Sequence, residues 1–432
     1  MEELFFELKQ KVYEKLDINL DVSDEDLYKV IDVCIYEISQ HRAISVHNRE
    51  LLRQQLYNSI KRLDILQELL EDDDITEIMI NGYKDIFIEK KGRITKWNKQ
   101  FESREKLEDI AQRIAAMSNK TINEAIPIVD TRLADGSRVN MVLSPIAIDG
   151  PVITIRKFYD TPIDIDRLIE LGSITKEAAD FLELLVKCRY NIFVSGGTGS
   201  GKTTFLNALS NFIPKDERVI TIEDSAELQI QGVGNLVRLE VRKSNMECDN
   251  EVSIRDLIRS SLRMRPDRII VGETRGEEAL DMLQAMGTGH DGSLSTGHSN
   301  SSKDMLTRLR TMVLMGIDMP AEAIDRQIAS AIDIIVHLKR MRDKTRKVWE
   351  ITEVCGYKNN EFELVPLYKY VEEGEDKNGN IIGTLKRQNN SLKNTEKLEW
   401  SKDTDRQLLS YHPTHPSILK KGFYFERLSV FS

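Results

Sequence analysis

Three patterns of hydrophobic and polar positions follow one another along the chain. In the first seventy residues, apolar side chains recur at helical spacing, first after Ser23-Asp24-Glu25-Asp26 and again from Leu51 to Leu70. The first stretch opens with a sequence typical of a helix N-cap, and the acidic run at 71–74 follows the second. The spacing therefore predicts a helical region over residues 1–70.

Alternation with a period of two replaces helical spacing from Ile75 onward. It predicts strands at 75–80, 86–89, 128–133, 138–142 and 152–156, with one helix at 107–117. Asn81-Gly82 and Asp135-Gly136 are turn signals between strands. We therefore expect a small α+β domain over residues 71–158, followed by a linker at Tyr159-Asp160-Thr161-Pro162.

Strand-like and helix-like segments alternate over residues 165–370. Helices are expected at 176–187, after Lys202, at 254–263 and at 277–286, with strands at 192–194, 219–222 and 268–271. This alternation favours an α/β domain, in which helices cover both faces of a parallel sheet. The remaining residues, 371–432, form a polar tail with a hairpin signal at Asn378-Gly379.

Composition narrows the class of protein. A chain of 432 residues suggests two or three domains, and 40% apolar with 31% charged residues suits a soluble globular protein. The four cysteines are far apart, which disfavours a disulfide framework or a zinc ribbon. A net charge of −10 argues against a general nucleic-acid coat. The acidic N-terminus does not resemble a signal peptide, and no apolar run is long enough to span a bilayer.

The segment after the strand at 192–194 carries the first candidate chemistry. It fits the phosphate-binding pattern G-x-x-x-x-G-K-[ST], and it lies between a predicted strand and a predicted helix, as the pattern requires. In such a loop, backbone N–H groups and the positive end of the helix surround a phosphate. We therefore predict a nucleoside triphosphate site formed by Gly196, Gly197, Thr198, Gly199, Ser200, Gly201, Lys202, Thr203 and Thr204.

Two acidic residues follow strands of the same region. Glu223 follows the strand at 219–222, and Glu273 follows Gly272 after the strand at 268–271. Ligands bind at the carboxyl ends of such strands, and nucleotide hydrolysis needs carboxylates for Mg²⁺ and for the attacking water. A helix cap is the alternative for either residue. Gly272 stands where an aspartate is usual, which on pattern alone weakens the assignment of a metal ligand here.

Two histidines, His290 and His298, flank a short strand-like segment rich in glycine and serine. Cysteines and carboxylates at zinc-ligand spacing do not accompany them, so a metal site is disfavoured. A pair of histidines can sense phosphate or couple neighbouring elements through hydrogen bonds. A structural role is the alternative for each histidine.

These motifs occur in a characteristic order: the loop at 196–203, Thr221-Ile222-Glu223-Asp224, residues 265–273, and residues 288–298. The order resembles the Walker A, Asp box, atypical Walker B and His box of the type II/IV secretion ATPase superfamily, in which a glycine at the position of Gly272 is usual. Segments 136–140, 153–158 and 308–315 look most similar to the tight-adherence (Flp) pilus assembly ATPases. The resemblance implies a RecA-like P-loop ATPase domain, a smaller α+β N-terminal domain and a helical N-terminal extension.

The resemblance also implies ATP hydrolysis with Mg²⁺. Lys202 would hold the β- and γ-phosphates and Thr203 would bind Mg²⁺. Glu223 would support Mg²⁺ or the water, and Glu273 would act as general base or orient the water. The same resemblance gives catalytic roles to His290 and His298 of the His box.

Arginines of the N-terminal domain complete the site that the resemblance implies. Arg138 and Arg156 match positions from which relatives send guanidinium groups toward the nucleotide, and Arg132 is a third candidate. A guanidinium offers a planar fork to phosphate oxygens as charge spreads over them. The alternative is that these are ordinary surface arginines.

The implied assembly is a homohexameric ring in the cytoplasm, held at the inner face of the cell membrane by an inner-membrane platform protein of a pilus or secretion machine, without direct nucleic-acid binding. A conjugative or type IV secretion motor that moves DNA or effector proteins is one alternative. A nucleotide-binding scaffold with little turnover is another. Gly287, Gly297 and Ser299 depart from the usual His box and favour that scaffold, and the chain lacks the four-cysteine zinc module of many type II members.

Overall fold

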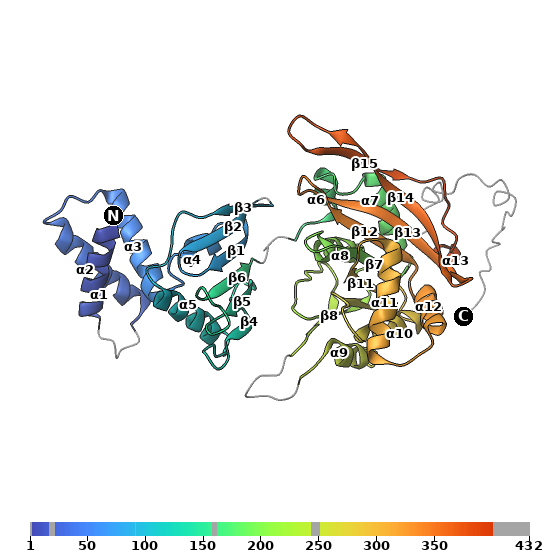
Figure 1. The fold of residues 1–432 in the computed structure, drawn as a ribbon, viewed down its shortest axis with the longest axis horizontal. Coiled ribbons are helices and arrows are strands. Elements are labelled where there is room, and N and C mark those ends of the chain that lie inside the picture. Colours follow the sequence, from blue (N-terminus) through green and yellow to red (C-terminus); the bar gives the residue numbers. More distant parts are fainter. Residues whose placement is uncertain (1, 17–21, 91, 158–161, 243–250, 401–432) are drawn as a thin grey trace, which may run out of the picture. The chain divides into compact units, whose positions relative to one another are not determined.

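The computed structural model describes residues 2–16, 22–90, 92–157, 162–242 and 251–400. The chain divides into two compact units, Met1–Asp160 and Thr161–Ser432 (Figure 1). The predicted linker lies outside the described residues except for Pro162, as does the predicted tail beyond residue 400. Among the described residues, no helix is both long enough and apolar enough to cross a bilayer.

The first unit begins with a helical region made of α1 (Glu2–Lys15), α2 (Asp24–Ser39), α3 (Val46–Lys61) and α4 (Leu66–Leu70). The predicted N-cap is confirmed, because the side chain of Ser23 accepts a hydrogen bond from the backbone N–H of Asp26. The single helix predicted from Leu51 to Leu70 is wrong. It breaks after Lys61, and Asp64 takes a left-handed φ of 55° between α3 and α4.

A six-stranded antiparallel sheet follows, in the order β3-β2-β1-β6-β5-β4. Its strands are β1 (Ile75–Asn81), β2 (Asp85–Lys90), β3 (Arg93–Lys96), β4 (Ile128–Arg132), β5 (Arg138–Val142) and β6 (Val152–Arg156). The single helix α5 (Arg104–Met117) packs its apolar side, with Leu107, Ile110 and Ile114, against buried strand residues such as Ile78 and Ile153. The opposite face of the sheet carries the polar residues of each alternating strand.

The second unit is built on a nine-stranded sheet in the order β15-β14-β13-β12-β7-β11-β10-β8-β9. The strands are β7 (Ile192–Gly196), β8 (Arg218–Glu223), β9 (Asn235–Glu240), β10 (Arg268–Val271), β11 (Leu294–His298), β12 (Ile334–Arg340), β13 (Arg346–Lys358), β14 (Glu361–Glu375) and β15 (Ile381–Arg387). Strands from β12 to β9 in this order are parallel, as predicted, but β13, β14 and β15 extend the sheet in antiparallel fashion. The hairpin predicted at Asn378-Gly379 joins β14 to β15.

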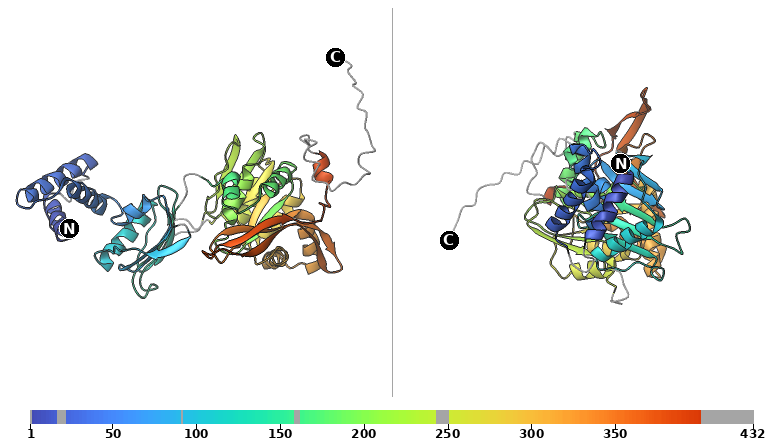
Figure 2. Two further views of the ribbon diagram at one scale, coloured as in Figure 1. Left: turned by 90° about the horizontal axis from the view of Figure 1, so that it is seen from above. Right: turned by 90° about the vertical axis from the view of Figure 1, so that its left-hand side faces the viewer.

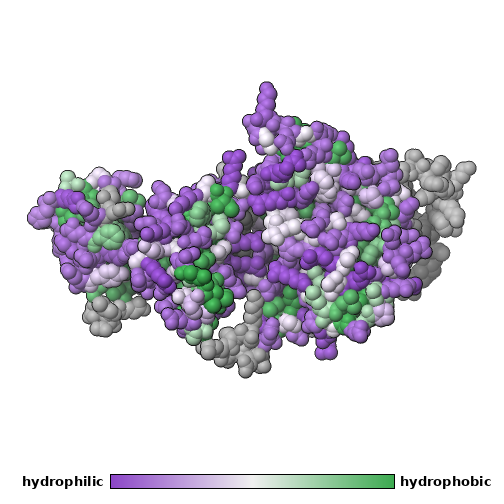
Figure 3. All heavy atoms as spheres, viewed as in Figure 1, coloured by the Kyte–Doolittle hydropathy of each residue, from purple (hydrophilic) through white to green (hydrophobic). Residues whose placement is uncertain are grey.

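Helices cover both faces of the parallel part (Figure 2). They are α6 (Ile165–Glu170), α7 (Lys176–Lys187), α8 (Lys202–Ser210), α9 (Ile254–Ser261), α10 (Glu278–Gly287), α11 (Ser302–Gly316), α12 (Ala321–Ala331) and the short α13 (Glu396–Trp400). Residues of β7 alternate between the two cores: Ile192 and Val194 pack with α7 and α8, whereas Phe193 packs with α10, α11 and α12. The face of the molecule drawn in Figure 3 is mostly hydrophilic, as expected once these cores are buried.

Candidate nucleotide-binding site

The glycine-rich loop joins the fully buried strand β7 to helix α8 at the carboxyl edge of the parallel strands. Gly201 is the N-cap of α8 and has φ 90°, a left-handed conformation that a glycine adopts without strain. It provides no side chain to cap the helix, so the N–H groups of the first turn receive no side-chain hydrogen bond from the N-cap. This is the arrangement that binds a phosphate group.

Lys202 begins α8 and is 7% exposed. Its Nζ donates to the carbonyl oxygen of Gly197 at 3.1 Å and lies 3.2 Å from Nδ1 of His298 at the end of β11. Because an ammonium group has only donors, Nδ1 of His298 is the acceptor. Burial and the charge of Lys202 lower the pKa of His298, so the imidazole is neutral at neutral pH.

Glu273 is the next polar group along this edge. Its Oε1 lies 2.9 Å from Nε2 of His298, and its Oε2 accepts a hydrogen bond from Arg275 at 2.6 Å. Burial alone would raise the pKa of Glu273, but the hydrogen bond from Arg275 and the nearby positive charges outweigh it, and the pKa lies below its usual value. Lys202, His298 and Glu273 therefore form a continuous polar line from the loop to an ionised carboxylate. The step from His298 to Glu273 in this line is a close approach and not a hydrogen bond, because Oε1 of Glu273 has no hydrogen-bond partner among the described residues.

Glu223 ends β8 and is 3% exposed. Its Oε2 accepts hydrogen bonds from the backbone N–H groups of Glu227 and Leu228, whereas its Oε1 is buried without a hydrogen-bond partner among the described residues. Burial raises the pKa of this carboxyl group. A carboxylate oxygen without a partner suits Mg²⁺ or a water molecule on it, but β8 is three strands away from β7, about 14 Å at ordinary strand spacing.

A steric contact explains why a glycine, and not the usual aspartate, stands at position 272 after β10. A Cβ atom at Gly272 would lie 2.9 Å from Cγ of Glu223. Glycine at this position leaves the space that the Glu223 side chain occupies. The glycine at position 272 and the position of Glu223 therefore belong together, because the side chain of Glu223 from β8 occupies the space beside Gly272.

The two histidines of the predicted pair are at opposite ends of β11. His298 pairs with Gly196 at the carboxyl end, whereas Leu294 pairs with Ile192 at the amino end, and His290 precedes Leu294. Five residues of strand separate the ends by about 15 Å. The structure thus brings His298 to the loop and does not bring His290 there. Among the described residues, no cluster of three or more His, Cys, Asp or Glu could hold a metal ion.

The three predicted arginines of the first unit lie side by side on its sheet. Arg132 of β4 is directly opposite Arg138 of β5, which is opposite Arg156 of β6, which in turn is opposite Glu77 of β1. Residues opposite each other on adjacent strands share one face of a sheet. The arginines therefore form a basic row on one face of this unit.

Sequence reasoning missed three arginines of the second unit. Arg275 follows Glu273 by two residues and is its hydrogen-bond partner, so its position in sequence was a usable signal. Arg346 donates to the carbonyl oxygen of Gly199, and Arg340 lies next to the same glycine. Nothing in the sequence pattern links these two residues to the loop, because the contact depends on β12 pairing with β7.

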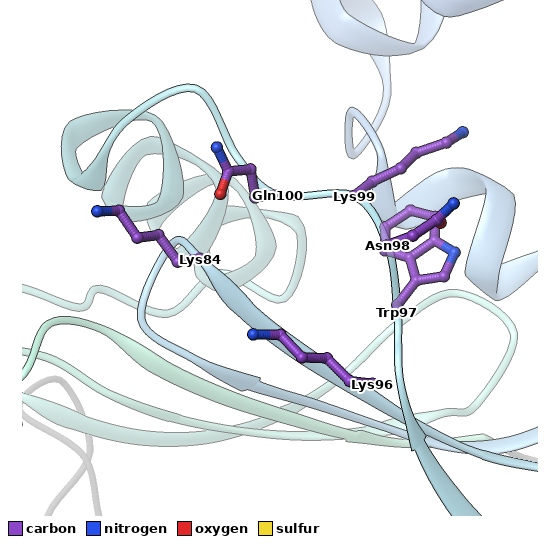
Figure 4. Close-up of a pocket in the computed structure, with 6 residues that line it drawn as sticks. All are labelled: Lys84, Lys96, Trp97, Asn98, Lys99 and Gln100. Atoms are coloured by element: carbon purple, nitrogen blue, oxygen red, sulfur yellow. The ribbon is translucent and has the colours of Figure 1, made fainter.

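A hollow of about 410 Å³ lies on the first unit, lined by Lys84, Lys96, Trp97, Asn98, Lys99 and Gln100 (Figure 4). Lys96 pairs with Asp85, and Lys99 pairs with Glu68. Each pairing offsets a positive charge of the lining, so the hollow offers little net attraction to an anion. It is a feature of the first unit and takes no part in the arrangement around the glycine-rich loop.

A loop of this pattern between a buried strand and a helix, at the carboxyl edge of a parallel sheet, defines the class of P-loop nucleotide-binding proteins. Within that class, the chain matches the type II/IV secretion system protein family over residues 60–378 and belongs to it. The predicted family is confirmed, and so is the predicted fold of a RecA-like domain with a smaller α+β domain and a helical extension.

The chain is 32% identical over 314 residues to the conjugal transfer protein TrbB of Rhizobium radiobacter, covering 72% of this chain and 93% of that protein. It is also 32% identical over 303 residues to the type IV secretion system protein VirB11 of Brucella suis, covering 64% and 84% of the two chains. The solved structure of the ATPase DotB of Yersinia pseudotuberculosis shares the fold at 18% identity, with a TM-score of 0.50 and 67% and 78% of the two chains covered.

Proposed function

We propose that this chain hydrolyses ATP as the motor of a secretion-type machine and works as a homohexameric ring. The observation that carries the proposal is the polar line from Lys202 through His298 to Glu273 at the carboxyl edge of the sheet. It connects the residue that would hold the phosphates to a carboxylate that stays ionised. Such a carboxylate is the group that orients and deprotonates an attacking water.

In this proposal, Lys202 transfers its donors from Gly197 and His298 to the β- and γ-phosphates of ATP. Its departure leaves His298 as a neutral imidazole between the phosphates and Glu273, with Nε2 2.9 Å from Oε1 of the carboxylate. Glu273 accepts the proton of the attacking water, and Arg275 holds the carboxylate in place. Mg²⁺, when bound, would neutralise phosphate charge. Thr203 would be its protein ligand, and Glu223, which lies three strands from β7, would act only through water.

The arginine row supports a role for a second protein surface in catalysis. Three guanidinium groups placed next to one another repel, and an anion of high charge would offset that repulsion. We propose that Arg138 and Arg156, assisted by Arg132, approach the nucleotide when the ring closes.

The machine that this motor drives has two candidates. The segments similar to tight-adherence pilus ATPases favour pilus assembly through an inner-membrane platform protein, to which the chain would bind at the inner face of the membrane. Similarity to TrbB along nearly the whole of that protein favours conjugal transfer or type IV secretion equally well. Identification of the membrane protein that co-purifies with this chain would separate these candidates. A low-turnover scaffold is the third candidate, and steady-state hydrolysis by the assembled ring would exclude it.

The direct test of the catalytic proposal replaces Glu273 by glutamine. Glu273→Gln should bind ATP as tightly as the wild type and lose turnover by a factor of about 10²–10⁴, because the base is gone while the loop is intact. Glu277→Gln is the matched control, since Glu277 is half-exposed and pairs with Arg255 away from the loop. Equal hydrolysis rates for the wild type and Glu273→Gln would remove Glu273 from the role of base.

A further inference from the structure

The turn between β12 and β13 lies against the glycine-rich loop. Arg346 donates from Nε to the carbonyl oxygen of Gly199 at 2.9 Å. Nη1 of Arg340 lies 3.4 Å from the position that a Cβ atom of Gly199 would occupy, and Cδ of Arg346 lies 3.3 Å from the corresponding position at Gly201. Two arginines from a distant part of the sequence thus contact the middle of the loop.

These two arginines are also direct partners across the antiparallel pair β12–β13. Like charges directly opposite each other destabilise a strand pair, so the arrangement carries a cost for folding. Arg342 of the same turn shows the ordinary alternative, because its guanidinium pairs with Glu372 and Glu375. The Arg340–Arg346 pair lies beside the loop to which the proposed function assigns a triphosphate.

The contact with Gly199 uses one of the five N–H donors of the Arg346 guanidinium. This hydrogen bond holds the loop at the carbonyl oxygen of Gly199 and does not involve the N–H groups of the loop. It also places a permanent positive charge next to the loop, since arginine stays protonated in proteins. Both effects favour an anion of high charge inside the loop, and the anion in turn offsets the repulsion between the two arginines.

We propose that Arg340 and Arg346 are positioning residues for nucleotide binding: they brace the P-loop at Gly199 and supply positive charge that favours the triphosphate. This inference rests on the proposed function, because it takes the ligand of the loop to be ATP. The Arg340–Arg346 pair is a third source of positive charge beside Lys202 and the arginine row, and it belongs to the same unit as the loop.

The test compares Arg346→Gln, the double variant Arg340→Gln/Arg346→Gln and the control Arg342→Gln in the full chain. The affinity for a fluorescent ATP analogue with Mg²⁺ is measured at low and moderate salt, and thermal midpoints are measured with and without ATP. We expect Arg346→Gln to weaken binding by about tenfold and the double variant to weaken it further, with a smaller salt dependence. Arg342→Gln should bind within about twofold of the wild type.

The midpoint without ATP separates this role from a structural one. In the double variant, the rise of the midpoint caused by ATP should shrink by more than the ATP-free midpoint falls. Arg346→Lys keeps the charge but not the fixed Nε donor, so its affinity should fall between those of the wild type and Arg346→Gln. Unchanged ATP affinity in the double variant would overturn the inference, as would a lower ATP-free midpoint with a full ATP response. A wild type that binds no ATP would instead refute the proposed function itself.

Discussion

The parallel strands of the nine-stranded sheet have an amino edge, where they begin, and a carboxyl edge, where they end. Both edges contain the same kinds of polar residue but use them in opposite ways. At the amino edge, Arg268 is fully buried and donates to both carboxylate oxygens of Glu217 and to the carbonyl oxygens of Val186 and Gly292. At the carboxyl edge, the Nζ group of Lys202 contacts a carbonyl oxygen and an imidazole nitrogen, and neither of these partners carries a negative charge. The partners of Arg268 are fixed parts of the fold, whereas Lys202 can exchange these partners for a ligand.

Other residues of the amino edge follow the same rule. The side chain of Asn191 donates to the carbonyl oxygens of Met286 and Ala331 and accepts from the N–H groups of Gly292 and Ser293. Lys397 of α13 pairs with both Asp291 and Asp333. His290 is the exception, because its Nδ1 is buried without a hydrogen-bond partner among the described residues. This edge joins the starts of the strands to one another, so its polar groups stabilise the fold.

At the carboxyl edge, some buried polar atoms lack a hydrogen-bond partner among the described residues. Glu223 has a buried oxygen without a partner, and the carboxylate of Glu273 contacts a neutral imidazole that sits between it and Lys202. A buried polar group that lacks a partner costs free energy, and such costs are tolerated where a ligand supplies the partner. The difference between the edges therefore separates residues kept for stability from residues kept for chemistry.

The largest effect in this comparison should come from Arg268 at the amino edge. Arg268→Leu leaves Glu217 buried with only the half-exposed Arg189 as a partner, so the free energy of unfolding should fall by about 3–5 kcal/mol. Denaturant titration followed by circular dichroism measures the loss. The double variant Arg268→Leu/Glu217→Leu should recover part of it, because no buried charge remains. A loss below about 1 kcal/mol would break the distinction between the edges.

A smaller effect is expected at Gly272 of the carboxyl edge. Gly272→Ala places a Cβ atom 2.9 Å from Cγ of Glu223, and the resulting displacement should cost about 1–3 kcal/mol of stability. Gly272→Asp, which restores the residue usual in other P-loop proteins, should lower both stability and ATP turnover for the same reason. Thermal unfolding and steady-state hydrolysis report the two losses. A gain of activity in Gly272→Asp would show that Glu223 does not replace the missing aspartate.

The smallest effect concerns pH. Burial lowers the pKa of His298, and it also lowers the pKa of His337, whose Nδ1 lies 2.9 Å from Oγ of Ser195. The unfolded chain binds these protons more readily, so the stability they contribute is present above the ordinary histidine pKa and is lost as pH falls below it. Denaturant titrations from pH 7 to pH 5.5 should show a decline of at most about 1.4 kcal/mol per pH unit for the buried His337, and a smaller one for His298, which is 36% exposed and screened by solvent. His337→Asn should flatten the decline, and an unchanged slope would contradict the assignment.

The sequence was sufficient for those parts of the site that depend on local order along the chain. A buried strand, a glycine-rich turn and a helix occur in succession, so the loop and the start of α8 at Lys202 could be predicted. Glu273 follows the end of one strand of the parallel sheet and His298 ends another, so both could be expected at its carboxyl edge. The break at Asp64 was not predictable from spacing, since the apolar positions continue through it.

Contacts that depend on strand order could not be predicted. The pattern did not reveal that β12 lies beside β7 and that Arg340 and Arg346 thereby contact the loop. Nor did it reveal that β11 runs through the sheet and leaves His290 at the amino edge. In both cases the pattern supplied the elements, and only the pairing of the strands decided which edge a residue reached.

The two histidines that flank β11 offer the most direct test, because His298 ends the strand at the carboxyl edge and His290 precedes its start at the amino edge. His298→Gln and His290→Gln are compared for steady-state ATP hydrolysis and for ATP affinity in the full chain, after matched thermal midpoints confirm that both fold. The account predicts that His298→Gln lowers turnover by about tenfold or more, since it removes the contact between Lys202 and Glu273, while His290→Gln stays within about twofold of the wild type. Loss of turnover in His290→Gln with full activity in His298→Gln would contradict the account.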